Sequence, residues 1–145
     1  MSNKYMELMT RQREERDKFP LAAAFSNEQF KSEMERLGVS DKSELVSIGF
    51  GAFCRKADAQ RWVEMTERHA QEIADEIAKD TTGDGFVKDM FRYELDNHEF
   101  GYTRDYTDAV AALGYTLQEI ADSSVLSHGF AEAMREAIEW DDAHA

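Results

Sequence analysis

The 145-residue sequence has little cysteine, little proline and no long apolar run. Cys54 is the only cysteine, so no disulfide can form within the chain, and a reducing compartment is the default expectation. The only proline is Pro20, which favours long helices because proline disrupts helix interiors. No apolar run approaches the roughly 20 residues that a membrane-spanning helix needs. We therefore expect a cytoplasmic protein without a membrane segment.

Positive charge is also scarce. The chain has 17 Lys and Arg against 30 Asp and Glu, a formal net charge of -13. Residues 1–56 carry a net charge of +1 and residues 57–145 a net charge of -14. A negative field of this size repels nucleic acid phosphates, so we expect no direct binding to DNA or RNA. Such a field favours either simple solubility or attachment to a basic surface on a protein partner.

The apolar pattern predicts an all-α fold. Hydrophobic residues make up 42% of the chain, enough for a core, and they recur at helical spacing. We predict one compact domain, residues 1–145, of six to seven helices. Residues 1–18 form its charged N-terminal helix, and residues 141–145 form a frayed tail. Gly49 and Gly51, set among aromatic residues, predict a short extended segment near residues 48–55.

Several helix ends carry recognisable capping residues. Ser26 followed three positions later by Gln29 predicts a capping box at the start of a helix, and Gly38 predicts its end. Asp58 is the expected N-cap of a long helix over residues 59–79. Thr116 is the expected N-cap of a short helix over residues 117–121.

The most specific local motif is the acidic turn at residues 80–87, DTTGDGFV. It matches the first eight positions of an EF-hand calcium loop, with Asp80, Thr82 and Asp84 as candidate oxygen ligands. The twelfth position should hold a bidentate Glu but is Phe91, so calcium or another divalent ion is one hypothesis. The alternative is a plain helix–helix turn in which Asp84 bonds to the backbone.

A second chemical hypothesis concerns the sequence around His98. Glu94 and His98 share one face of a helix, and Glu99 follows directly. These three side chains are where a small enzyme's site would be sought. A metal site needs three or four ligands, and surface ion pairs explain the same spacing equally well.

Our leading interpretation is a non-catalytic interaction protein that presents an acidic face from residues 58–108 to a basic partner. No catalytic residues are assigned, and no cofactor is required. The candidate partner-binding residues are Glu64, Glu67, Glu72, Asp75, Glu76, Asp80, Asp89 and Asp96.

Several segments together resemble a known protein family. They are residues 19–20 (FP), 24–30 (AFSNEQF), 48–56 (IGFGAFCRK), 82–86 (TGDGF), 90–91 (MF) and 94–100 (ELDNHEF). This pattern resembles a family of small proteins of unknown function from bacteriophages and bacterial mobile elements. The resemblance implies a non-secreted protein that acts in the cytoplasm of a bacterial host cell. The partner would then be a nucleic-acid-binding defence complex. The protein would block this complex by competing with DNA or RNA, as anti-CRISPR and other DNA-mimic inhibitors do.

Overall fold

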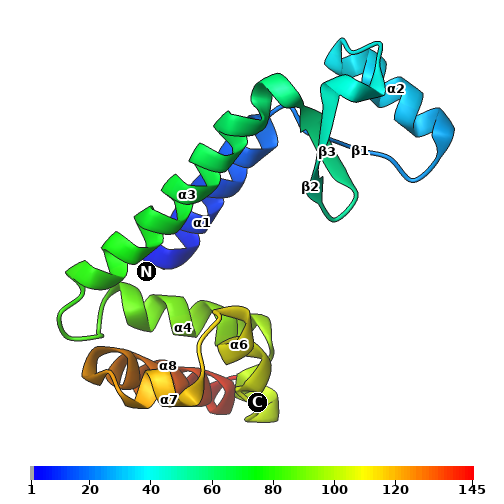
Figure 1. The fold of residues 1–145 in the computed structure, drawn as a ribbon. Helices are drawn as coiled ribbons and strands as arrows, with labels where there is room; N and C mark the ends of the chain where they lie inside the picture. Colours follow the sequence, from blue (N-terminus) through cyan, green and yellow to red (C-terminus); the bar gives the residue numbers. More distant parts are fainter. Residues whose placement is uncertain (1) are drawn as a thin grey trace. The chain divides into compact units, whose positions relative to one another are not determined.

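The computed structural model describes residues 2–145, which form eight α-helices, one 3-10 helix and a three-stranded sheet (Figure 1). The helices are α1 (Lys4–Lys18), α2 (Asn27–Leu37), the 3-10 helix η1 (Lys42–Glu44), α3 (Lys56–Lys79), α4 (Phe86–Asn97), α5 (Phe100–Thr103), α6 (Thr107–Ala112), α7 (Leu117–Ala121) and α8 (Ser124–Ala143). The strands are β1 (Ala22–Ala23), β2 (Leu45–Gly49) and β3 (Ala52–Arg55). The predicted helical character is confirmed, whereas the all-α assignment is wrong because of the sheet. Within residues 2–145, no helix is apolar over a length that would cross a bilayer.

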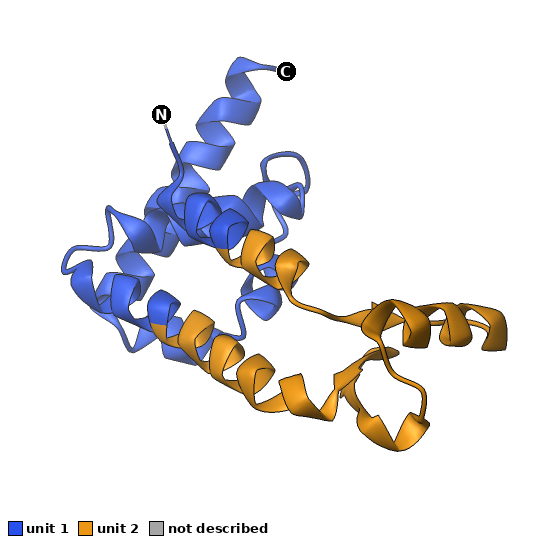
Figure 2. Cartoon of the chain, turned by 90° about the horizontal axis from the view of Figure 1, so that it is seen from above, with its two compact units in different colours: residues 1–11, 72–145 blue, residues 12–71 orange. Residues whose placement is uncertain are grey.

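The described chain forms two compact units (Figure 2). Residues 2–11 and 72–145 make the helical unit, and residues 12–71 make the hairpin unit, so the boundary between the units falls inside α1 and α3. Each unit has a hydrophobic core of its own. The prediction of one domain over residues 1–145 stays a prediction.

The sheet belongs to the hairpin unit and is antiparallel, in the order β1-β3-β2. Central strand β3 places Phe53 opposite Ala22 of β1 and Ser47 of β2. The hairpin tip is Phe50, which is fully exposed and has a left-handed φ of 56°. The extended segment predicted near residues 48–55 is thus the larger part of a hairpin. The sequence did not reveal β1, because two alanines carry no strand signature.

The core of the hairpin unit is small. Its buried side chains are Ala22, Leu37, Val39 and Phe53, and half-buried Phe30 packs on Phe53 with 5.3 Å between ring centroids. Cys54, next along β3, is completely buried and is a small core residue. Burial raises the pKa of its thiol, so Cys54 is held in the unreactive protonated form.

Asp58 has a different role from the predicted cap. Helix α3 starts at Lys56, three residues before the predicted start at residue 59, so Asp58 lies inside its first turn. Its buried carboxylate accepts a hydrogen bond from Arg55 Nε at 2.9 Å and pairs with Arg61 at 3.4 Å. Two cations therefore compensate the buried charge, and together they link the end of β3 to the start of α3.

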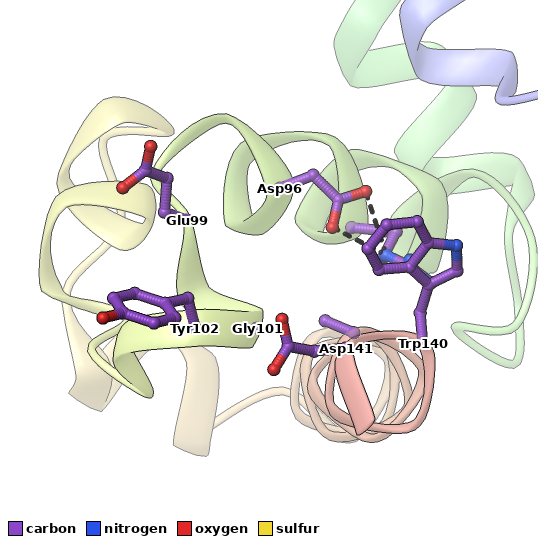
Figure 3. A pocket seen from close by; sticks show the side chains of 8 residues that line it. Asp96, Glu99, Gly101, Tyr102, Trp140 and Asp141 are labelled. Atoms are coloured by element: carbon purple, nitrogen blue, oxygen red, sulfur yellow. Dashed lines mark hydrogen bonds and ion pairs between the residues drawn. The ribbon is translucent and has the colours of Figure 1, made fainter. Parts of the chain in front are cut away.

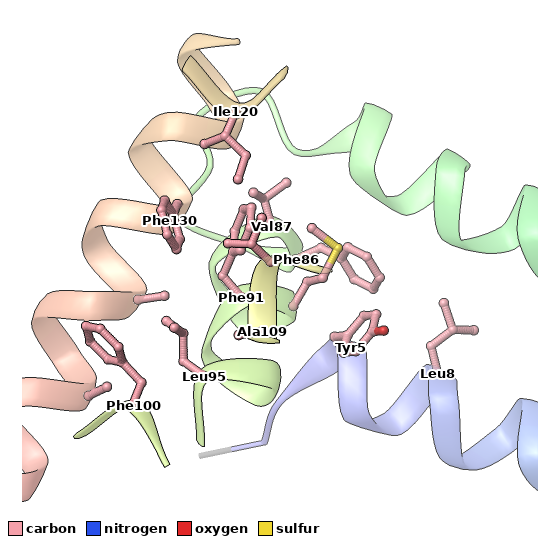
Figure 4. Packing of buried hydrophobic residues seen from close by; sticks show 14 residues of the cluster. Tyr5, Leu8, Phe86, Val87, Phe91, Leu95, Phe100, Ala109, Ile120 and Phe130 are labelled. Atoms are coloured by element: carbon pink, nitrogen blue, oxygen red, sulfur yellow. The ribbon is translucent and has the colours of Figure 1, made fainter. Parts of the chain in front are cut away.

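The core of the helical unit is built around α4 (Figure 4). Val87, Met90, Phe91 and Leu95 lie at helical spacing on one face of α4, and each is at most 2% exposed. They pack chiefly against α8, where the ring centroids of Phe91 and Phe130 are 5.0 Å apart. The first turns of α1 complete the core with two further side chains, Tyr5 and Leu8.

Two glycines bring the turn between α3 and α4 directly against α8. Gly83 has a φ of 92°, and an added Cβ there would lie 2.4 Å from the carbonyl oxygen of Val125. A Cβ on Gly129 would lie 2.6 Å from Cγ1 of Val87 and 2.9 Å from the carbonyl oxygen of Gly83. Real Cβ atoms do not approach this closely, so both positions require glycine.

The C-terminal helix differs from prediction in its length. Helix α8 extends to Ala143, through residues expected to be a frayed tail. Two contacts explain the extra turn. The rings of Trp140 and His144 stack with their centroids 3.9 Å apart, and Asp142 pairs with Arg104 at 3.1 Å.

Candidate functional site

Negative charge is concentrated in the helical unit. That unit contains seven Lys and Arg against nineteen Asp and Glu, a formal net charge of -12. The hairpin unit contains ten Lys and Arg against eleven Asp and Glu, a net charge of -1. The imbalance seen between the two parts of the sequence is therefore a property of one folded unit.

The predicted acidic residues fall into both units. Glu64 and Glu67 are exposed on α3 within the hairpin unit. The others belong to the helical unit: Glu72, Asp75 and Glu76 on α3, Asp80 in the following turn, and Asp89 and Asp96 on α4. The six residues of the helical unit are thus the part of the predicted face that shares one folded unit.

All six of these carboxylates make interactions inside the protein. Glu76 pairs with Lys79 at 3.2 Å, and Asp96 accepts from Arg92 Nε with both oxygens at 3.0 Å. Asp89 accepts the backbone N–H of Lys4 at 2.9 Å, which fastens the start of α1 to α4. Two more of the set, Glu72 and Asp75, also make interactions of their own. Exposed ion pairs contribute little free energy, so these carboxylates can give up the internal cation and pair with a cation of another molecule.

Asp80 closes the turn that carries the calcium-loop motif. One of its carboxylate oxygens accepts the backbone N–H of Gly83 at 2.9 Å and of Thr82 at 3.3 Å. The other accepts the N–H groups of Gly85 at 3.1 Å and Val87 at 3.0 Å. Burial raises the pKa of Asp80, but these backbone donors outweigh it and hold the pKa below its ordinary value.

The other two predicted ion ligands are also engaged. The hydroxyl of Thr82 accepts the backbone N–H of Asp84 at 3.1 Å, and the Asp84 carboxylate lies 2.7 Å from His128 Nε2 on α8. Phe91, at the position of the missing Glu, is 1% exposed and belongs to the core. Within residues 2–145, no three His, Cys, Asp or Glu side chains are grouped so that they could hold a metal ion. These contacts explain the motif as a structural turn, and the ion site stays a hypothesis.

The residues around His98 form a pair and an isolated third member. His98 Nε2 lies 3.4 Å from the Glu94 carboxylate, as the spacing on one helix face predicts. Glu99 leaves the helix with a left-handed φ of 59° and is exposed. The arrangement fits an ion pair near the end of α4, and the hypothesis of an enzyme site remains a prediction.

The structure contains a groove that sequence reasoning did not identify. It lies between the end of α4, the single turn α5 and the end of α8, with a volume of about 690 Å³ (Figure 3). Its lining residues are Arg92, Asp96, Glu99, Gly101, Tyr102, Ala137, Trp140 and Asp141. Two exposed aromatic side chains border it, Tyr102 at 83% and Trp140 at 56%. In Figure 3, these two rings stand on either side of the groove, with Asp141 between them.

The groove also contains acidic side chains that lack a counterion. Arg92, its only basic lining residue, is held by both oxygens of Asp96 and pairs more distantly with Glu136 at 3.5 Å. The carboxylates of Glu99 and Asp141 form no ion pair within residues 2–145. Three acidic side chains and one basic side chain therefore line a concave surface that has two exposed aromatic rings. Such a surface is suited to a cationic ligand.

Comparison with known protein families assigns the chain to one of them. A family model described as "Family of unknown function (DUF7659)" matches residues 4–136, and the chain belongs to that family. Searches of curated proteins and of solved structures returned no match.

Proposed function

We propose that this protein is a non-catalytic binding protein that attaches its acidic helical unit to a basic surface on a protein partner. The observation that carries the proposal is the confinement of the charge, -12, to one unit. A field of this strength attracts basic surfaces and accelerates their association. The near-neutral hairpin unit is left for other contacts, including the fully exposed Phe50.

The finer form of the proposal concerns what the partner normally binds. Basic protein surfaces are commonly those that contact nucleic acid phosphates. We therefore propose an inhibitor that occupies the nucleic-acid-binding site of a host defence complex, as DNA-mimic proteins do. The sign and the location of the charge support this form of the proposal.

The test uses defined fluorescent peptides of twelve residues, in which Ser alternates with Arg, with Glu or with Asn. Fluorescence anisotropy measures binding at 50 and 150 mM NaCl. We expect the Arg peptide alone to bind, with an affinity that falls as salt rises because exposed charges are screened. Equal binding of the Asn peptide would refute the proposal. Addition of double-stranded DNA should release the protein from the Arg peptide by competing for it.

A matched pair of triple variants separates a binding unit from mere net charge. Glu72→Gln, Asp75→Asn and Glu76→Gln remove three charges from the helical unit. The control variant removes three exposed charges from the hairpin unit: Glu14→Gln, Glu28→Gln and Glu35→Gln. At about 0.2–1 kcal/mol for each of three charges, the first variant should bind roughly threefold to 150-fold more weakly. Equal losses in both variants would show that only net charge matters.

A further inference from the structure

We propose that the groove between α4, α5 and α8 receives an arginine side chain of the protein partner. Two exposed aromatic rings and the unpaired carboxylates of Glu99 and Asp141 come together there around one concave surface. This inference rests on the proposed function, because it names the place in the helical unit where the basic partner is anchored.

The groove has a fixed backbone. Gly101 lies so close to α8 that an added Cβ would be 3.1 Å from the carbonyl oxygen of Ala137 and 3.1 Å from Cβ of Asp141. The turn α5 lies between two left-handed residues with side chains, Glu99 at φ 59° and Arg104 at φ 62°. Left-handed residues other than glycine are uncommon and cluster at functional sites.

Side-chain contacts also hold α5 in place. Phe100 is 4% exposed and anchors the turn in the core of the helical unit. Arg104, at the other end of α5, donates from its side chain to Asp142 on α8 at 3.1 Å. Because both ends are fixed, the exposed Tyr102 is presented on a rigid support, and little ordering is needed when a ligand binds.

The chemistry of the lining selects a planar cation. Two unpaired carboxylates repel phosphates and attract positive charge. The exposed faces of Tyr102 and Trp140 attract cations through their π systems. A guanidinium group is planar, stacks on such rings and donates two parallel hydrogen bonds to one carboxylate, whereas an ammonium group does neither. The occupant we infer is therefore an arginine, in preference to a lysine.

Trp140 provides a direct reporter for the test. The chain has two tryptophans, so Trp62→Phe leaves Trp140 as the only one, at the groove. The Arg–Ser peptide is titrated into this variant at 150 mM NaCl, and a Lys–Ser peptide of equal length is the comparison. We expect a saturable change in Trp140 fluorescence. The dissociation constant of the Lys peptide should be at least about threefold larger than that of the Arg peptide.

Single substitutions then locate the site. Asp141→Asn and Glu99→Gln should each weaken binding of the Arg peptide about fivefold, and Tyr102→Ala should do so by a similar factor without lowering the thermal midpoint. Asp108→Asn is the matched control, since Asp108 is exposed in the same unit, has no ion pair and lies outside the groove lining. It should change the affinity less than twofold.

The outcomes distinguish this inference from the proposed function. If Asp108→Asn weakens binding as much as Asp141→Asn, attraction is diffuse; the groove is then not the anchor, although the acidic unit still binds. Saturable binding of the Arg peptide by anisotropy, without a change in Trp140 fluorescence, would also refute the groove as the binding site. If the unsubstituted protein does not prefer the Arg peptide over the Asn peptide, the proposed function itself fails.

Discussion

Replacement of Gly83 by Ala should destabilise the helical unit by about 3 kcal/mol. The backbone at Gly83 has a φ of 92°, and a left-handed conformation costs a residue with a Cβ roughly 1–2 kcal/mol. The new methyl group would also lie 2.4 Å from the carbonyl oxygen of Val125 and 3.0 Å from the backbone nitrogen of Gly129. Both are backbone atoms of α8, so only a shift of the helix relieves the overlap, at a further cost of about 1–3 kcal/mol.

The assay is urea denaturation followed by far-UV circular dichroism, together with a thermal melt. At about 3–4 °C for each kcal/mol in a chain of this length, the thermal midpoint should fall by roughly 10 °C. Gly114→Ala is the matched control, because Gly114 has a φ of 77° in the same unit and an added Cβ would meet no atom within 4 Å. It should cost only the backbone contribution, about 1 kcal/mol. If Gly83→Ala costs no more than Gly114→Ala, the close packing of the turn on α8 is refuted.

Three further predictions concern the acidic turn and the buried thiol. Asp80→Asn should destabilise the protein by about 1–3 kcal/mol at neutral pH, measured by urea denaturation, because one oxygen that accepts backbone N–H groups becomes an NH₂ donor. The pKa of Asp80 in the folded protein is below its value in the unfolded chain. The stabilisation is therefore fully present above the unfolded pKa and is lost as pH falls through the folded pKa. In acid, the unsubstituted protein and Asp80→Asn should converge in stability. Millimolar calcium should leave the thermal midpoint unchanged relative to EDTA, and a rise that Asp84→Ala abolishes would establish the ion site instead. Cys54 should react with a thiol reagent only after denaturation, and rapid reaction of the native protein would contradict its complete burial.

Local helix signals were predicted well from the sequence because their physics is local. Ser26 accepts the N–H of Gln29 at 3.1 Å, and Gly38 ends α2 with a φ of 73°, as predicted. The short helix at Leu117–Ala121 has the predicted bounds, and Thr116 caps it through a complete capping box. At Ser26 the predicted capping box is only half formed, because Gln29 Oε1 accepts the backbone N–H of Phe25, one residue before the cap, instead of that of Ser26. Each signal involves residues that are at most four positions apart.

The predictions were less accurate where an element depends on contacts between residues that are distant in the sequence. β1 is a strand only because Ala22 lies opposite Phe53, and no pattern within two residues can indicate that pairing. Asp58 has the residue type of an N-cap, but α3 begins three residues earlier than predicted, and the Asp58 carboxylate pairs with Arg55 and Arg61 instead. In both cases, contacts with other side chains or strands outweighed the local preference of the residue type.

The same distinction explains why the most specific motif and the candidate groove differ in predictability. The residues of the acidic turn lie within eight positions, so the pattern is visible in the sequence, yet the side chains of Asp80 and Thr82 are used to shape the turn. The groove joins residues 92–102 to residues 137–141, which no local pattern connects. Its one local sign was the aromatic, irregular stretch after His98, where Gly101 permits contact with α8 and Tyr102 remains exposed. Single exposed aromatic side chains are ordinary on protein surfaces, so it is the placement of two of them beside unpaired carboxylates in one groove that supports the proposed ligand site.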